Sequence, residues 1–278
     1  MRIVSPAKIN LSLSVGPVLD SGYHQLDSYF HLISLTDTLT LAQSQHFAFS
    51  SSVNLDIPDE ENLVVKAVDE MVKLHHSISG GARPNIHLHL DKKIPHGAGL
   101  GGGSSNAAAA IYGLSQIWGL QPSDPRHLEI AGHLGSDVPL FLAPTTASIM
   151  TGTGATLKQS LPPIVDMNLV IVAPAGTHSP TSAVYKAFDD DPQPTHSLDL
   201  WENNLQKAAI EVSPKTGQVL EWLSAQTQVQ LAQVSGSGCA CWAQVQCRTD
   251  ADHVVKAAQS RGYLAFKAHT LSRGIHIL

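Results

Sequence analysis

Apolar and polar residues alternate along several stretches of the N-terminal part of the chain. Residues 9–15 run Ile-Asn-Leu-Ser-Leu-Ser-Val, and similar alternation follows over residues 29–41 and 86–90. Because successive side chains of a strand point to opposite faces, this pattern predicts strands with one buried and one solvated face. Residues 62–74 carry apolar side chains at helical spacing behind Asn62, a residue type that caps helices. We therefore expect a sheet with a helix packed against it.

The C-terminal part of the chain mixes both kinds of element. Its pattern predicts strands over residues 168–172, 228–231 and 239–247, and helices over residues 201–211 and 216–224. Strands mixed with helices in both halves favour an α+β fold over a doubly wound sheet. Residues 152–163 are rich in Gly, Thr, Ser and Pro, which predicts a domain boundary. We expect an N-terminal domain over residues 1–156 and a C-terminal domain over residues 157–278.

Composition narrows the possible partners. The 278 residues, 43% of them hydrophobic, can bury a core of ordinary size. The net charge of −6 is wrong for a protein that holds a polyanion, so nucleic acid is not an expected partner. No apolar run approaches the roughly 18 residues of a membrane helix, and no signal peptide opens the chain. We expect a cytoplasmic protein with no membrane partner, and the sequence does not predict its oligomeric state.

Cysteine and histidine offer two weak metal signals. Cys239, Cys241 and Cys247 lie in one strand-like stretch without the second ligand pair of a typical zinc site. We interpret them as buried reduced thiols, which are typical of a reducing compartment, and a metal or redox role is the alternative. His87 and His89 share one face of a strand, where a solvated face is favoured over a metal pair.

A glycine-rich loop is the most informative feature. Five of the seven residues 97–103 are glycine, so the backbone can take positive φ and approach a ligand closely. Ser104, Ser105 and Asn106 follow as candidate helix caps, and an alanine-rich helical stretch comes next. The free N–H groups and positive end of such a helix bind anions. This arrangement predicts a phosphate-binding loop, with a flexible surface loop as the alternative.

The type of phosphate loop can be narrowed from its surroundings. Residues 97–102 match G-x-G-x-x-G, which would suggest a dinucleotide-binding dehydrogenase. However, residues 91–96 separate the loop from the preceding apolar strand, whereas the dinucleotide motif follows its strand directly. No G-K-[ST] sequence occurs, which excludes a Walker A loop. A dehydrogenase is therefore disfavoured.

Three further positions carry candidate chemistry. Asp137, in Gly-Ser-Asp-Val-Pro, could accept a proton from a substrate hydroxyl, or it could only cap a helix or shape a turn. Lys8 lies in the first strand, where an inward-facing lysine needs an anionic partner; a side chain in solvent is the alternative. Tyr23 and His24 could stack on and hydrogen-bond a flat ring such as a nucleobase, or they could form an ordinary packed turn.

Taken together, these motifs resemble the GHMP kinase superfamily. The resemblance rests on PHGAGLGGGSSNAA (95–108), PAKINL (6–11), GYHQL (22–26), GSDVP (135–139) and SGSG (235–238), which occur in the family's order. It implies an N-terminal domain like domain 2 of ribosomal protein S5 and a C-terminal ferredoxin-like domain. The implied reaction transfers the γ-phosphoryl group of ATP to the 2-hydroxyl of a cytidyl-diphospho-methylerythritol, in the non-mevalonate route to isoprenoid precursors.

The resemblance also implies residue roles on the ATP side. Asp137 resembles the catalytic base, and Lys8 resembles the cation beside it. Asn62 and Leu63 resemble the segment near the adenine. The residues that would wrap the phosphates are Pro95, His96, Gly97, Ala98, Gly99, Leu100, Gly101, Gly102, Gly103, Ser104 and Ser105.

On the substrate side, the resemblance implies that Tyr23 and His24 hold the cytosine ring, that Asn10 reaches the substrate, and that Tyr185 forms a second aromatic wall. Mg²⁺ is expected together with ATP, but no ligand to the metal is predicted.

Three positions depart from the family pattern, and three other functions remain open. Asn204, in Asn-Asn-Leu over residues 203–205, stands where Asp is common. Asn106 stands where Asp is usual and would remove a charge near the phosphates, and Ala155 replaces a usual Glu. The alternatives are another GHMP kinase acting on mevalonate-type, homoserine or sugar substrates, a non-catalytic nucleotide-binding member, and the disfavoured dehydrogenase.

Overall fold

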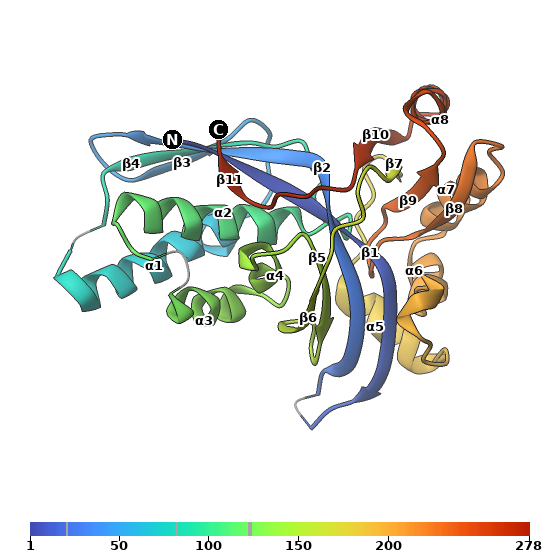
Figure 1. Ribbon diagram of the computed structural model, residues 1–278, viewed down its shortest axis with the longest axis horizontal. Helices are drawn as coiled ribbons and strands as arrows, with labels where there is room; N and C mark the ends of the chain where they lie inside the picture. Colours follow the sequence, from blue (N-terminus) through green and yellow to red (C-terminus); the bar gives the residue numbers. More distant parts are fainter. Residues whose placement is uncertain (21, 82, 122–123) are drawn as a thin grey trace.

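The computed structural model describes residues 1–20, 22–81, 83–121 and 124–278, and within them the strands form two sheets (Figure 1). The first sheet contains β1 (Arg2–Val18), β2 (His24–Gln43), β3 (Ala48–Ser51), β4 (Ile86–Asp91), β5 (Ala147–Thr151), β6 (Thr156–Leu161) and β11 (His276–Ile277). The second sheet contains β7 (Asn168–Ala173), β8 (Val229–Val234), β9 (Cys241–Val245) and β10 (Leu264–His269). The pairs β1–β2, β2–β4 and β7–β9 are antiparallel, which excludes a doubly wound parallel sheet.

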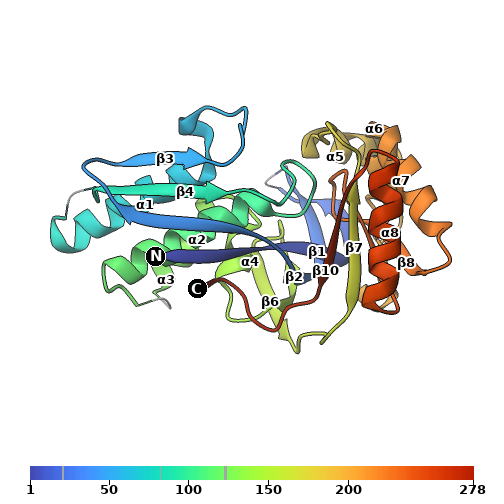
Figure 2. The same ribbon diagram turned by 90° about the horizontal axis from the view of Figure 1, so that it is seen from above.

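Helices cover one face of each sheet. Those of the first sheet lie below it in Figure 1 and are α1 (Leu63–Ser79), α2 (Gly102–Ile117), α3 (Pro125–Leu134) and α4 (Val138–Leu142). Those of the second sheet, seen beside it in Figure 2, are α5 (Thr181–Asp190), α6 (Gln206–Val212), α7 (Pro214–Ser224) and α8 (Arg248–Ser260). Two short 3₁₀ helices span Asp59–Glu61 and Leu198–Leu200. No helix in the described part of the chain is long and apolar enough to cross a membrane.

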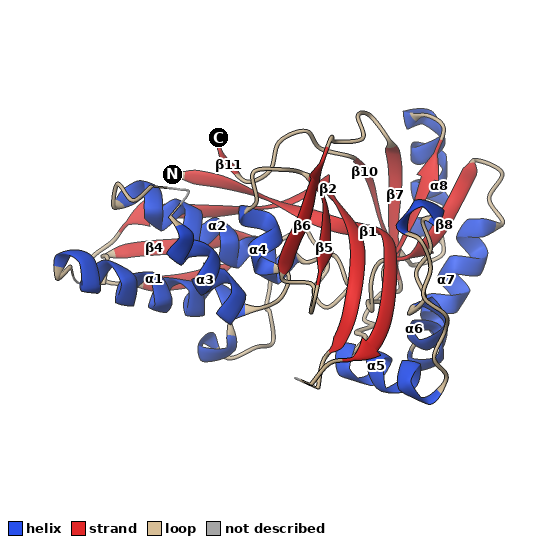
Figure 3. Cartoon of the chain, turned by 60° about the horizontal axis from the view of Figure 1, so that its bottom comes forward, coloured by secondary structure: helices blue, strands red, loops and turns tan. Residues whose placement is uncertain are grey.

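The β1–β2 hairpin connects the two parts of the molecule. Its antiparallel register shifts between Pro6 and Ala7, between Asn10 and Ser12, and between Val15 and Val18. Such irregularities bend a strand pair, and the hairpin curves away from the helices of the first sheet until its tip lies near α5 (Figure 3). The curved pair therefore extends from the first sheet to the helices of the second.

Strand β1 is buried on both faces. Ser12 and Ser14 are 0% and 7% exposed, so the prediction of a solvated face over residues 9–15 is wrong. The second sheet covers that strand, and the Trp242 indole donates a hydrogen bond to the Asn10 carbonyl oxygen at 2.9 Å. Ser12 in turn donates to the Glu202 carbonyl oxygen, so this burial does not leave its hydroxyl without a partner.

Three local predictions also need correction. Residues 152–163, predicted as a boundary, contain β6, which pairs with β5 in a hairpin; the division of the chain at 156/157 stays a prediction. The helix predicted over 201–211 begins only at Gln206, because Asn203 and Asn204 hydrogen-bond to the neighbouring β-segments instead. Cys239 and Cys241 are buried free thiols as expected, but Cys247 is exposed at the start of α8.

The two helix starts near the glycine loop differ in their capping. Asn62 caps α1 as predicted, because its side chain accepts a hydrogen bond from the Val64 N–H. Helix α2 begins at Gly102 and has Gly101 at its cap position with φ +68°. Ser104, Ser105 and Asn106 therefore lie inside α2, and the prediction that they cap it is wrong. The cap position has a positive φ, which glycine takes readily.

Candidate active site

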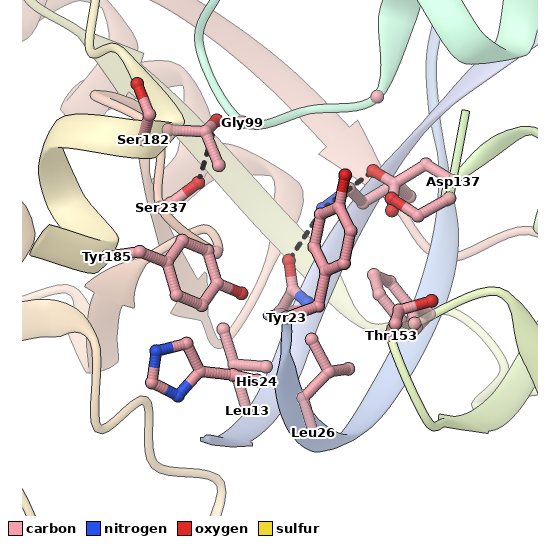
Figure 4. Close-up of a pocket in the computed structure, with 18 of the residues that line it drawn as sticks. Leu13, Tyr23, His24, Leu26, Gly99, Asp137, Thr153, Ser182, Tyr185 and Ser237 are labelled. Atoms are coloured by element: carbon pink, nitrogen blue, oxygen red, sulfur yellow. Dashed lines mark hydrogen bonds and ion pairs between the residues drawn. The ribbon is translucent and has the colours of Figure 1, made fainter. Parts of the chain in front are cut away.

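A cavity of about 700 Å³ lies where the β1–β2 hairpin, the glycine loop, α4 and α5 meet. Figure 4 shows Asp137 and Thr153 on one side of this cavity and Tyr185 with His24 on another. Lys8 and Asn10 also line it. The structure thus brings together eight of the residues that the sequence predicts for the site, which are Lys8, Asn10, Tyr23, His24, Gly99, Gly101, Asp137 and Tyr185.

Lys8 and Asp137 form an ion pair at the wall of the cavity. The Lys8 Nζ lies 3.6 Å from Asp137 Oδ2, donates a hydrogen bond to Asn10 Oδ1 at 2.8 Å, and lies 4.9 Å from the centre of the Phe30 ring. Only 5% of Lys8 is exposed, so the alternative of a side chain in solvent is wrong. Burial lowers the pKa of Lys8, and the charge of Asp137 partly offsets that effect.

Asp137 keeps its carboxylate available to the cavity. It stands at the cap position of α4, but its side chain makes no capping hydrogen bond. Its side chain is 31% exposed, against 6% for that of Lys8. The alternative of a helix-capping side chain is therefore wrong, and a carboxylate oxygen beside a buried ammonium faces the space where a hydroxyl could bind.

Asn10 fixes the direction in which Lys8 points. Its Nδ2 donates to Ser28 Oγ at 2.8 Å, and Ser28 donates onward to the Ser12 carbonyl oxygen. This chain leaves the Asn10 carbonyl oxygen to accept from Lys8, so the amide cannot reverse without losing both bonds. Three polar residues of the hairpin therefore position one ammonium group.

The glycine loop is held between the two parts of the molecule. The Lys8 N–H donates to the Leu100 carbonyl oxygen, and the Ala240 N–H donates to that of Ala98, both at 3.0 Å. Gly99 has φ +82°, and a Cβ there would collide with the carbonyl oxygen of Ser235. A Cβ on Gly101 would lie 2.8 Å from the Phe141 ring. Glycine is needed at both positions, and both line the cavity.

The other residues predicted for ATP binding lie around the loop and not on the cavity wall. Ala98 and Leu100 are buried, and the Ser105 hydroxyl is completely buried and accepts a hydrogen bond from Ser5 Oγ. Leu63 lies beside the loop, since a Cβ on Gly103 would be 3.7 Å from Leu63 Cδ1. The predicted adenine segment is therefore next to the start of α2.

Aromatic residues form the wall opposite the Lys8–Asp137 pair. The His24 ring lies 5.3 Å from the Tyr185 ring and 5.8 Å from the Phe188 ring, while Tyr23 is 67% exposed at the rim (Figure 4). Burial, with a smaller effect from Asp137, raises the pKa of Tyr185 to about 12, so its phenol stays neutral. Such a wall can stack against a planar ring.

Sequence reasoning missed a second Lys–Asp pair beneath the glycine loop. Asp37 is completely buried and accepts hydrogen bonds from Lys92 Nζ at 2.7 Å, from the N–H groups of Lys93 and Ile94, and from Asn106 Nδ2 at 3.0 Å. Burial lowers the pKa of Lys92, and Asp37 partly offsets this. A signal for this role was present in the sequence, because alternation places Asp37 on the same face as the buried leucines at positions 35, 39 and 41, where an acid needs a partner.

This network accounts for one departure from the family pattern. Asn106 is 1% exposed, accepts from Ser5 Oγ and donates to Asp37 Oδ2. An aspartate there would set a second carboxylate against Asp37. Ala155 is near the cavity in sequence, because Thr153 and Gly154 line it. Nothing in the structure explains the alanine.

Comparison with known proteins defines the class. Residues 62–144 match the family model of the GHMP kinases N terminal domain. Solved structures of a mevalonate kinase (13% identical, TM-score 0.68) and of a homoserine kinase from Cytophaga hutchinsonii (16% identical, TM-score 0.71) share the fold over 98% and 100% of this chain. The α+β fold and the predicted GHMP kinase resemblance are confirmed, and the fold is that of a GHMP kinase.

Nearer relatives define the family within that class. The 4-diphosphocytidyl-2-C-methyl-D-erythritol kinase of Mesorhizobium japonicum is 34% identical over 96% of this chain and 94% of its own length. A crystal structure of 4-(cytidine 5'-diphospho)-2C-methyl-D-erythritol kinase, 30% identical, superposes with TM-score 0.78 over 99% of this chain and all of that one. The chain belongs to the family of 4-diphosphocytidyl-2-C-methyl-D-erythritol kinases. It spans 62% of the length of the chloroplastic relative from Mentha piperita.

Proposed function

We propose that the protein transfers the γ-phosphoryl group of ATP to the 2-hydroxyl of 4-diphosphocytidyl-2-C-methyl-D-erythritol. The observation that carries this proposal is the pairing of Lys8 with Asp137 on the wall of a cavity that is bordered by the glycine loop and by the His24–Tyr185 wall. The names of the relatives support the same substrate. The reaction belongs to the non-mevalonate route to isoprenoid precursors.

In the proposed reaction, Asp137 acts as the general base. Its carboxylate takes the proton of the 2-hydroxyl while the hydroxyl oxygen forms a bond to the γ-phosphorus, and the bond from that phosphorus to the β-phosphate oxygen breaks to release ADP. Lys8 offsets the negative charge that develops as the proton leaves. Asn10 holds the ammonium in place through the hydrogen bond described above.

The glycine loop and the aromatic wall supply binding in this proposal. Gly99 and Gly101 allow backbone N–H groups to approach the ATP phosphates, and the start of α2 adds its dipole. Tyr23, His24 and Tyr185 hold the cytosine ring. Mg²⁺ prefers phosphate and carboxylate oxygens, and Asp137 offers such a carboxylate at the cavity. When bound, Mg²⁺ neutralises phosphate charge.

An ADP-release assay with Mg²⁺-ATP tests this function. 4-Diphosphocytidyl-2-C-methyl-D-erythritol, mevalonate and homoserine are compared, with Asp137→Asn as the blank. We expect turnover with the cytidyl alcohol alone, and its loss in the variant. Turnover with mevalonate or homoserine alone would show that this alcohol is the substrate and that the cytidyl alcohol is not. If folded protein binds ATP but releases no ADP with any of the three alcohols, a non-catalytic nucleotide-binding role is favoured.

A further inference from the structure

His24 is enclosed by groups from two distant segments of the chain. Its side chain is 9% exposed, with the Tyr185 and Phe188 rings of α5 against it. Its Nδ1 lies 2.9 Å from the Gly16 carbonyl oxygen, and its Nε2 lies 3.0 Å from Asp189 Oδ1. Both partner atoms are acceptors: a carbonyl oxygen on β1 and a carboxylate oxygen on α5.

These two acceptors determine where the hydrogens of the ring must be. A neutral imidazole has one N–H and one lone pair, so either tautomer would turn a lone pair toward one of these oxygens. Only the imidazolium donates to both. Asp189 is 53% exposed in its side chain, so a charged carboxylate there is well solvated and can favour the imidazolium.

We propose that Asp189 is a positioning residue for the cytidyl end of the substrate, because it holds His24 as an imidazolium against Tyr185. This inference rests on the proposed function and extends it to a residue outside the family motifs quoted above. Asp189 and His24 both line the cavity. A free carboxylate at that wall would repel a diphosphate-bearing substrate, and pairing with an imidazolium removes that repulsion.

Few charged groups lie around His24 in the described part of the chain. On α5 the titratable residues near it are Tyr185, Lys186, Asp189 and the neighbouring Asp190, and Lys186 also lines the cavity. Residues 13–17 of β1, which include Gly16, carry no titratable side chain. On β2 the nearest acid, Asp27, pairs with Lys158 of β6. Asp189 is therefore the acid whose contact with His24 the proposal invokes.

The test compares Asp189→Asn with Asp190→Asn, a matched change at the next residue of the same helix. We expect Asp189→Asn to raise KM for the cytidyl substrate about tenfold, with kcat and the KM for ATP nearly unchanged, since only substrate positioning is affected. Asp190→Asn should match the wild type. Asp189→Glu should restore part of the affinity, because it keeps the charge.

A pH profile separates positioning from simple packing. The dependence of KM for the cytidyl substrate on pH should differ between the wild type and Asp189→Asn, because only the wild type presents a carboxylate to the His24 ring. A KM for Asp189→Asn equal to that of the wild type at every pH would overturn the proposal. An equal loss in Asp190→Asn would also overturn it.

A measurement on the substrate-free protein tests the charge state of His24 independently of the proposed function. ¹⁵N NMR of the free protein reports the hydrogens on each histidine ring, and the His24 signal is identified by its loss in His24→Gln. Hydrogens on both ring nitrogens at the pH of the kinetic assay support the proposal; a hydrogen on only one nitrogen overturns it. If the wild type does not turn over the cytidyl substrate, the proposed function fails and Asp189 loses its substrate role, while NMR still decides the charge state.

Discussion

Two lysine–aspartate pairs flank the glycine loop, and they differ in what surrounds the carboxylate. Asp37 is completely buried and accepts four hydrogen bonds, from Lys92, from two backbone N–H groups and from Asn106. Asp137 is partly exposed and lies 3.6 Å from Lys8, on the wall of the cavity. A saturated carboxylate can only hold structure together, whereas one with an unused oxygen beside a cavity can take a proton.

The lysines of these pairs show the same contrast. Lys92 donates to Asp37 and to the Ile94 carbonyl oxygen, so it supports the segment that leads into the loop. Lys8 is held by a neutral amide and lies farther from its acid. Burial lowers the pKa of both lysines. Residue type alone therefore does not show which pair is saturated with hydrogen bonds and which borders the cavity.

The largest expected effect is on turnover. Asp137→Asn should lower kcat by roughly 10²–10⁴-fold, because an amide cannot take the hydroxyl proton. The free energy of unfolding should change little, since Asp137 makes no capping bond. Steady-state kinetics and urea unfolding of the same sample check both parts. A variant with near-wild-type kcat would remove Asp137 as the base.

The other pair should respond in stability. Asp37→Ala leaves the Lys92 ammonium buried without its acid, and breaking such a pair costs about 3–5 kcal/mol of unfolding free energy. Replacing both partners, in Asp37→Ala with Lys92→Met, should recover part of that loss, because no charge is then left uncompensated. Urea unfolding of the single and double variants measures this. A single variant as stable as the wild type contradicts the structural role.

A smaller effect is expected at Asn106. Asn106→Asp places a carboxylate against Asp37 and removes the donor that Asn106 Nδ2 supplies. Loss of that hydrogen bond and the added repulsion should cost about 1–3 kcal/mol of stability. The repulsion between the two carboxylates exists only while both are ionised, so the loss of stability in this variant should be smaller at low pH. Unfolding measured at two pH values tests this, and an unchanged stability at neutral pH would count against the contact.

The smallest expected effect is on the alkaline side of the pH–rate profile. Lys8 must keep its proton to offset charge at Asp137, and burial lowers its pKa from the model-compound value of 10.5. The charged form is lost as pH rises through that lowered pKa, so kcat should begin to fall below pH 10.5. Turnover measured up to the pH at which the protein unfolds checks this. A flat alkaline profile would mean that the charge of Lys8 does not limit the reaction.

Short sequence motifs were enough to predict many residues of the candidate site. The five motifs, read in order, predicted the GHMP kinase family, the phosphate loop and the roles of Lys8 and Asp137 as candidates. Residues 62–74 predicted α1 and its Asn62 cap correctly. These features depend on short-range chemistry: helical spacing, capping and glycine conformations are set by neighbours a few positions away.

The tertiary structure decided what distant segments do to each other. Alternation predicted that Ser12 faces solvent, but the second sheet covers it. Alternation places Asp37 on the buried face of its strand, but it does not show that Lys92 and Asn106 pair with this acid. The contact of His24 with Asp189 joins residues 165 positions apart, and no local pattern encodes it. The sequence by itself determined the family, the glycine loop and the candidate pair. Which segment covers a strand, and which partners its polar groups find there, followed only from long-range packing, because both depend on residues far away in the sequence.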